Sequence, residues 1–171
     1  MDKVIELLFY TAPAIVTGLV AIYYFKHFTA NEDRRRAHEL RKEGRNIALP
    51  VRLQAFERLT LFLERISIGK LLLRVKPTGK DPQKYADKLI AIVEQEFEHN
   101  MAQQIYVSET AWKAVVTSKN VIVKLIRTSA DKPEVESASQ LAEDLIKTGT
   151  KGEGPTGAAI SFLKIEAQKL F

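Results

Sequence analysis

The sequence predicts an all-α chain, with a single N-terminal transmembrane helix, a polar stalk helix and a small cytoplasmic domain of about five helices. Three observations predict this class. Eighteen of the first 25 residues are apolar, apolar residues after residue 49 recur at helical spacing, and no segment shows the sustained alternation that is typical of a half-buried strand. We therefore divide the chain into an anchor (residues 1–28), a stalk (29–48) and a helical domain (49–171).

The predicted anchor has the length of one membrane crossing. Residues 7–25 carry no charge, and a helix from Ile5 to Phe25 spans about 30 Å, the hydrocarbon thickness of a bilayer. The acidic start and the long apolar run argue against a cleaved signal peptide. Small residues at a spacing of four would let another membrane helix pack closely, in the pairs Ala14 with Gly18 and Thr17 with Ala21.

The residues that flank the anchor predict its orientation. Seven cations follow the apolar run within 20 residues, whereas only Lys3 precedes it. Cations near a membrane span are retained on the cytoplasmic side, so we expect the N-terminus outside and the helical domain in the cytoplasm. The cluster Arg34, Arg35 and Arg36 is also a candidate for contact with anionic lipid head groups.

The elements after the anchor are predicted from caps and breaks. Asn31 is a candidate N-cap and Gly44 a candidate stop for the stalk helix, and Pro50 fits the first position of the next helix. That helix carries apolar residues at helical spacing up to Ile66. Residues 71–75 fit either the end of a helix or a strand, and residues 77–79 break the chain.

Four more helices complete the predicted domain. Asp81 and Pro82 begin a helix that ends near Tyr106, and Ser108 caps the next one. Residues 131–136 form a connection, a shorter helix over 138–149 is terminated by Gly149, and residues 157–171 form the last helix.

One part of this pattern resembles a known family. Residues 48–59 (ALPVRLQAFERL) and 61–66 (LFLERI), after an N-terminal membrane helix, are similar to a family of short uncharacterised proteins from Bacteroidota. The likeness extends to residues 103–108 and Trp112. It implies the bacterial inner membrane as the location, and it implies no activity and no site residues.

Two motifs match nucleotide sites in spacing. Gly152, Gly154 and Gly157 have the spacing of a dinucleotide-binding turn, but they follow a predicted helix instead of a strand, and too little chain remains for a second strand. Residues 149–154 approach a phosphate-binding loop but lack its Lys-Ser/Thr pair. We therefore predict a loop here and no cofactor.

A second set of motifs occurs in the order found in penicillin-binding proteins. The set comprises Ser67 with Lys70, Ser118 with Asn120, and Lys147-Thr148-Gly149. The chain is far shorter than that fold, Ser67 is also explained as a helix cap, and Lys147-Thr148-Gly149 is also explained as a helix end. We therefore predict no catalytic residue.

Composition and one further motif bear on metals and on nucleic acid. The chain has no Cys, which excludes disulfides and thiolate metal sites. Glu96 and His99 share a helix face, but the second pair that a di-iron bundle requires is missing, so we expect no metal. The net charge is +5, but six of the 14 aromatic residues lie in the first 28 residues instead of among the cations, so nucleic acid is not an expected partner.

The sequence thus leads to a function by elimination and location. The main hypothesis is a non-catalytic adaptor or accessory subunit of a membrane protein complex, or a homo-oligomer, with no small-molecule substrate. Its expected partner face is Arg52, Arg58 and Arg65 on the helix that follows Pro50. The alternatives are a binder of anionic lipid through residues 34–36, and an enzyme or regulator with an unrecognised site.

Overall fold

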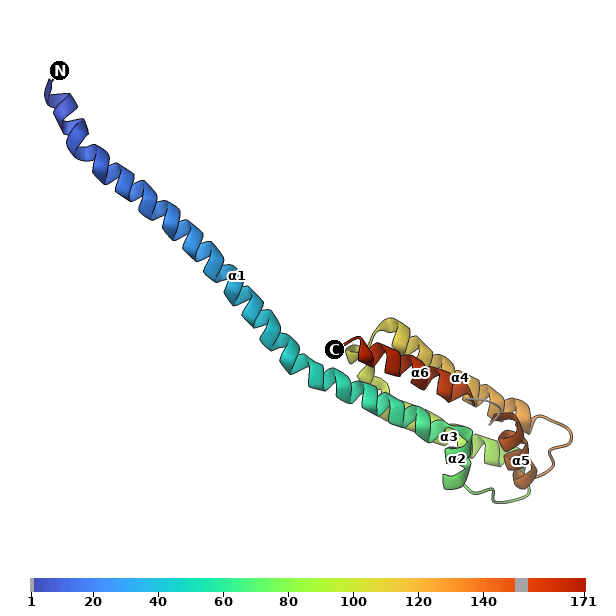
Figure 1. Cartoon of the computed structure of the whole chain (residues 1–171). Helices are drawn as coiled ribbons and strands as arrows, with labels where there is room; N and C mark the ends of the chain where they lie inside the picture. Colours follow the sequence, from blue (N-terminus) through green and yellow to red (C-terminus); the bar gives the residue numbers. More distant parts are fainter. Residues whose placement is uncertain (1, 150–153) are drawn as a thin grey trace. The chain divides into compact units, whose positions relative to one another are not determined.

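The computed structural model describes residues 2–149 and 154–171, and from residue 47 onward it describes their side chains as well. Before residue 47, side chains are described at residues 11, 13–26, 35, 36, 39, 43 and 44. All the elements of the described chain are helical, which confirms the all-α prediction for these residues. The helices are α1 (Asp2–Ile66), α2 (Ile68–Arg74), α3 (Pro82–Asn100), η1 (Met101–Tyr106), α4 (Glu109–Ala130), α5 (Ala138–Gly149) and α6 (Gly154–Gln168) (Figure 1).

The first helix contradicts the prediction of a membrane anchor. No helix among the described residues combines the length and the apolar character that a membrane crossing requires. The predicted transmembrane helix is therefore wrong, and the single-pass inner-membrane location and orientation that depended on it are not supported.

The first helix also continues through the predicted boundaries of the stalk. Asn31, Gly44 and Pro50 all lie within α1 instead of at its ends. A glycine inside a helix costs about 1 kcal/mol relative to alanine, which strong helix formers nearby can offset. Residues 39–43 (Glu-Leu-Arg-Lys-Glu) are such formers. Pro50 is followed in the same helix by Ala55 and Phe56, whose burial stabilises that part of α1.

The chain divides into two compact units. Unit 1 comprises Met1–Ala48 and unit 2 comprises Leu49–Phe171. Unit 2 contains the hydrophobic core, to which α1, α3, α4, α5 and α6 all contribute side chains. Its largest fully buried residues include Phe62, Leu89, Ile122, Leu145 and Leu163.

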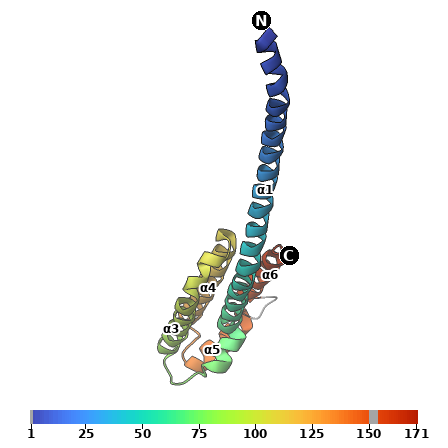
Figure 2. The ribbon, with the colours of Figure 1, turned by 90° about the vertical axis from the view of Figure 1, so that its left-hand side faces the viewer.

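The helices of unit 2 pack together through their apolar faces. The helix α4 packs against α3 (Figure 2) and against α6, while α5 packs against α2, α3 and α4. Ring contacts join α1, α3 and α4, because Phe97 lies 5.9 Å from Phe62 and 5.5 Å from Trp112 between ring centroids. The segment at residues 71–75, for which the sequence allowed either a helix end or a strand, belongs to α2 and its C-cap.

Two of the predicted helices begin at the N-cap residues that the sequence indicated. The Asp81 carboxylate accepts hydrogen bonds from the backbone N–H groups of Gln83 and Lys84 at 3.0 and 3.2 Å, with Pro82 at the first position of α3. Ser108 accepts one from the Ala111 N–H at 3.1 Å and begins α4. The helix predicted to end near Tyr106 ends earlier, at Asn100, and continues as the 3₁₀ helix η1.

Candidate interaction surfaces

The three arginines of the predicted partner face have different environments. Arg52 donates a hydrogen bond from Nε to the Tyr106 carbonyl at 3.1 Å, and Arg65 forms an ion pair with Glu96 at 3.2 Å. Arg58 is exposed and forms no ion pair with the described part of the chain. The structure therefore does not bring the three together as one free face, because two of them hold other elements in place.

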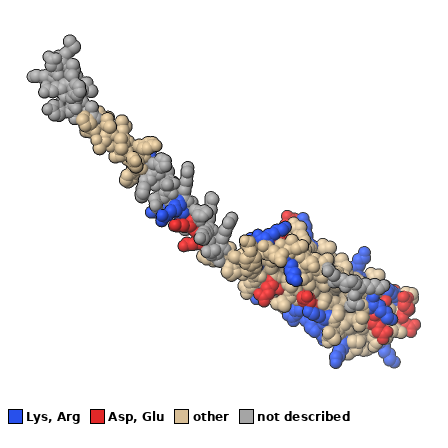
Figure 3. Space-filling view, in the orientation of Figure 1, with Lys and Arg blue, Asp and Glu red and all other residues tan. Residues whose placement is uncertain are grey.

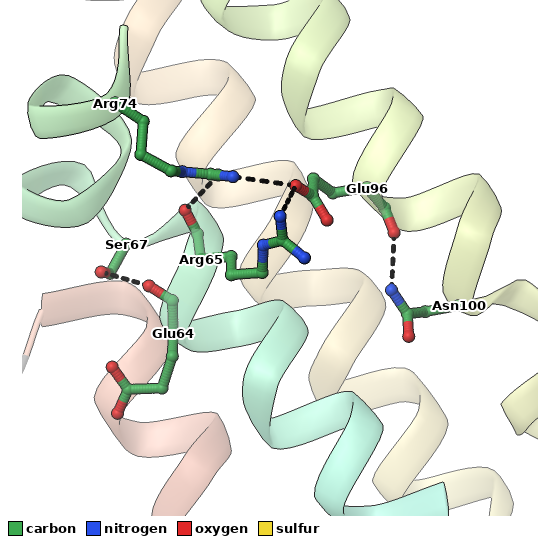
Figure 4. A network of polar contacts seen from close by, with 6 residues as sticks. All are labelled: Glu64, Arg65, Ser67, Arg74, Glu96 and Asn100. Carbon is green, nitrogen blue, oxygen red and sulfur yellow. Dashed lines mark hydrogen bonds and ion pairs between the residues drawn. The ribbon is translucent and has the colours of Figure 1, made fainter.

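Glu96 is the centre of a clamp between three helices (Figure 4). Its side chain is 13% exposed, and its Oε1 atom lies 3.0 Å from Nη1 of Arg74 and 3.2 Å from Nη2 of Arg65. Arg74 also donates from Nη2 to the Arg65 carbonyl at 2.9 Å, and Asn100 donates to the Glu96 carbonyl at 2.8 Å. One carboxylate thus joins α1, α2 and α3, which is a structural role.

The same clamp engages the acidic residue of the Glu96 and His99 motif. The carboxylate of Glu96 already interacts with two guanidinium groups, while His99 is exposed. No group of three or more His, Asp or Glu side chains suited to a metal ion occurs among the residues that the structure describes.

The residues of the penicillin-binding motifs are engaged in separate local contacts. The Ser67 hydroxyl donates to the Glu64 carbonyl at 2.7 Å, and Lys70 pairs with the Glu64 carboxylate. Ser118 is buried and donates to the Pro155 carbonyl at 3.0 Å. Within the described residues, no hydrogen bond connects one of these motifs to another.

The glycine motif is described only in part. Gly152 lies outside the described residues, as does most of the loop between α5 and α6. Gly154 begins α6 with a backbone φ of 65°, a left-handed conformation that glycine adopts without strain. Gly149 ends α5, as predicted.

A surface that the sequence analysis did not identify lies around η1. None of the six residues of η1 is buried, and three of them are exposed large apolar side chains: Met101, Ile105 and Tyr106. Ile105 is 73% exposed. The bond from Arg52 to the Tyr106 carbonyl brings this segment to α1, where Val51 is also exposed. We call Val51, Met101, Ile105 and Tyr106 the η1 surface.

The sequence analysis missed this surface because it predicted a regular α-helix through Tyr106. An α-helix would have continued the buried stripe of Tyr85, Leu89 and Val93, whereas the tighter 3₁₀ turn changes which side chains face the core. Met101 and Ile105 continue the interval of four residues that runs from Val93 through Phe97, so spacing alone gave no signal that they are exposed.

A second exposed surface follows α1 in unit 2. Leu61 is 53% exposed on the side of α1 opposite its buried residues. The residues near it on this side are Gln54, Glu57, Arg58, Glu64 and Arg65. We call these six residues, Leu61 included, the α1 outer face. On the side of the molecule drawn in Figure 3, acidic and basic side chains are interspersed over unit 2 and do not form one basic area.

Unit 1 carries the predicted packing and lipid-contact residues. Ala14, Thr17, Gly18 and Ala21 are exposed, and the Thr17 hydroxyl donates to the Pro13 carbonyl at 2.6 Å. Helix packing through these residues is not tested by the structure. Of the three lipid-contact residues, Arg35 lies 3.5 Å from Glu39, Arg36 is exposed, and the side chain of Arg34 lies outside the described residues.

Two further ion pairs lie in unit 2 away from these surfaces. The ammonium group of Lys119 lies 2.8 and 2.9 Å from the Glu94 carboxylate oxygens and 4.9 Å from the centre of the Phe97 ring. Lys132 lies 2.7 and 2.9 Å from the oxygens of Asp144. The first pair joins α4 to α3, and the second joins the connection after α4 to α5.

Comparison with known proteins gives one match. The sequence profile of a family of unknown function, DUF7935, matches residues 2–170. No curated protein and no solved structure matches the chain.

Proposed function

The chain belongs to the DUF7935 family of unknown function, and from that premise we propose that it is a non-catalytic adaptor or accessory subunit that binds a partner protein through the η1 surface. The proposal includes an origin in Bacteroidota, which the sequence resemblance implied. One observation carries it: η1 places no side chain in the core, yet it exposes Met101, Ile105 and Tyr106.

The chemistry of the η1 surface suits protein recognition. Tyr and Met are enriched at protein interfaces, and Met adapts its flexible side chain to an irregular partner surface. Three exposed large apolar residues within the six positions of η1 mark an interaction site more often than exposed apolar residues that are scattered singly.

The way η1 is held also supports binding. The bond from Arg52 to the Tyr106 carbonyl fixes the end of η1 against α1, so less conformational entropy is lost when a partner binds. Arg52 thus retains a role in the proposed partner face as the support of η1. In addition, the motifs with catalytic spacing use their side chains for contacts within the chain, as Ser67 and Ser118 do.

The test is site-specific photo-cross-linking in the native host. A photoreactive side chain replaces Ile105 in one tagged full-length chain and Lys124, an exposed residue of α4, in a second. We expect one protein to be cross-linked from position 105 in constant ratio, and not from position 124. Capture of the same proteins from both positions would contradict the proposal.

A matched pair of substitutions completes this test. Ile105→Asp places a charge in the η1 surface and is expected to abolish the cross-linked complex, while Val121→Asp, at an exposed apolar residue of α4, leaves it unchanged. Circular dichroism establishes that both variants fold. Binding of anionic lipid through residues 34–36 stays a prediction, which a vesicle-binding assay of R35E/R36E chains would test separately.

A further inference from the structure

The α1 outer face has charges arranged in two rows. At 3.6 residues per turn, Glu57 and Glu64 lie on one side of Leu61, and Arg58 and Arg65 lie on the other. Gln54 lies between the rows, two turns from Leu61. The surface therefore has a narrow middle with one large apolar residue, an acidic edge and a basic edge.

We propose that the α1 outer face binds the same face of a second copy of this chain, with the two α1 helices parallel and in register. This proposal is independent of the η1 surface, because it concerns a different set of residues and a different partner. Most soluble homo-oligomers are two-fold symmetric and use the same patch on both subunits.

The charge pattern selects the parallel arrangement. A two-fold axis parallel to the helices places the acidic edge of one copy opposite the basic edge of the other, on both sides of the contact. An antiparallel pair places acidic edge opposite acidic edge and basic edge opposite basic edge. Opposite charges across an interface favour the correct register, and like charges cost several kcal/mol.

The heights of the charged residues along the helix agree with this arrangement. In an in-register parallel pair, each residue lies at the same height as its equivalent in the other copy. Arg58 and the second copy's Glu57 then differ by about 1.5 Å along the axis, the rise of one residue. The same holds for Arg65 and Glu64.

Glu57 and Arg58 contribute most to this inference. Glu64 pairs with Lys70 and Arg65 pairs with Glu96 within one copy. Glu57 and Arg58 are exposed, and neither forms an ion pair with a described residue. Their opposite charges are thus available to a second copy.

The middle of the face supplies contact and register. Leu61 meets its own equivalent, which removes apolar surface from water in both copies. Gln54 also meets its equivalent, and a pair of polar side chains in a helical seam specifies alignment at some cost in stability.

Charge reversal in the full chain tests the proposal. Light scattering measures the mass of the full chain, and the mass of bound detergent is subtracted. A mild detergent is used because it covers the exposed apolar residues of unit 1. We expect a dimer. Arg58→Glu or Glu57→Arg, each alone, should weaken the dimer about tenfold or more, because each places like charges together. The double variant E57R/R58E should restore it.

The experiment has a matched control, and two results would overturn the proposal. Lys124→Glu reverses an exposed charge on α4 and should leave the dimer unchanged. A wild-type chain that stays monomeric up to high concentration would overturn the proposal. A dimer that neither single reversal weakens, or that the double variant does not restore, would also overturn it, because association would then use another surface.

Cross-linking tests the orientation, since the chain has no natural Cys. Gln54→Cys and Leu61→Cys, made separately, should each form a disulfide between two copies under mild oxidation, whereas Ser139→Cys on α5 should not. In an antiparallel pair, position 54 of one copy lies near position 61 of the other. A mixture of the two variants would then form disulfides between a Gln54→Cys chain and a Leu61→Cys chain. That result would overturn the parallel arrangement.

Discussion

A β-carbon placed on Gly149 would lie 2.7 Å from Cγ1 of Ile68 and 3.1 Å from its Cβ. Gly149 is the last residue of α5 and Ile68 is the first of α2, so the two helices meet where one side chain is missing. The backbone of Gly149 is not in the left-handed region, in contrast to Gly79 and Gly154. Close approach, and not a turn, therefore requires glycine at this position.

We expect Gly149→Ala to lower the free energy of unfolding by about 1–3 kcal/mol, the usual cost of overpacking. Rotation of the Ile68 side chain cannot relieve the clash completely, because its Cβ is fixed by the backbone of α2. Urea denaturation followed by circular dichroism measures the effect.

The matched control for this prediction is Gly69→Ala. Gly69 lies in α2 beside Ile68, but nothing lies within 4 Å of an added β-carbon. Alanine is the better helix former there, so a gain of up to about 1 kcal/mol is expected. Equal effects of the two substitutions would show that propensity, and not the contact with Ile68, governs position 149.

The pair of Asp144 and Lys132 predicts a pH dependence of stability. The hydrogen bond from Lys132 holds the pKa of the Asp144 carboxyl below 3.8, the ordinary value for aspartate, and a hydrogen bond from Ser129 assists, while partial burial opposes this shift. A depressed pKa in the folded state means that the stabilisation is complete above the unfolded pKa. It is lost as the pH falls through the folded pKa.

Asp144→Asn should therefore lower the free energy of unfolding by about 1–2 kcal/mol at pH 7, and the difference from wild type should shrink as the pH falls below 3.8. Urea midpoints at pH 7 and pH 3 measure this difference. Glu143→Gln, at the exposed neighbouring residue, is the control and should show no such difference. A difference that is the same at both pH values would show that lost packing, and not lost charge, destabilises the variant.

The helix starts could be predicted from the sequence because they depend on neighbouring residues. Asp81 caps backbone groups two and three residues away, and Ser108 caps one three residues away. The continuity of α1 was missed because Gly44 and Pro50 are local signals for a break, which the surrounding helix overrides.

The candidate surfaces were harder to predict because distant residues create them. Arg52 and Tyr106 are 54 residues apart, and nothing near either one indicates their hydrogen bond. Arg65 was correctly placed on the polar side of its helix, but its pairing with Glu96 depends on how α1 and α3 pack. Spacing along one helix identifies the side that faces outward, and only the fold shows which of its residues are already paired.

The clamp at Glu96 predicts a loss of stability when its charge is removed. Glu96→Gln keeps the size of the side chain but leaves the guanidinium groups of Arg65 and Arg74 without their shared carboxylate. Hydrogen bonds to charged groups contribute about 1.5–3 kcal/mol, so a loss of about 2 kcal/mol is expected in urea denaturation. Glu98→Gln on the exposed side of α3 is the control, and an equal loss there would contradict a specific role for the clamp.

Tyr85 predicts both a stability effect and a spectroscopic one. Its hydroxyl donates to the Val75 carbonyl at 2.6 Å at the end of α2, and burial raises the pKa of the phenol above 10.0. Tyr85→Phe leaves that carbonyl without its donor and should cost about 1 kcal/mol.

Because the raised pKa favours the neutral phenol in the folded state, the stabilisation is present below pH 10 and is lost as the pH rises further. In an alkaline titration of the folded chain at 295 nm, ionisation of Tyr85 should therefore appear as a late step, and this step should be absent in Y85F. A Y85F chain that retained the late step would assign it to another tyrosine and contradict the buried hydrogen bond as its origin.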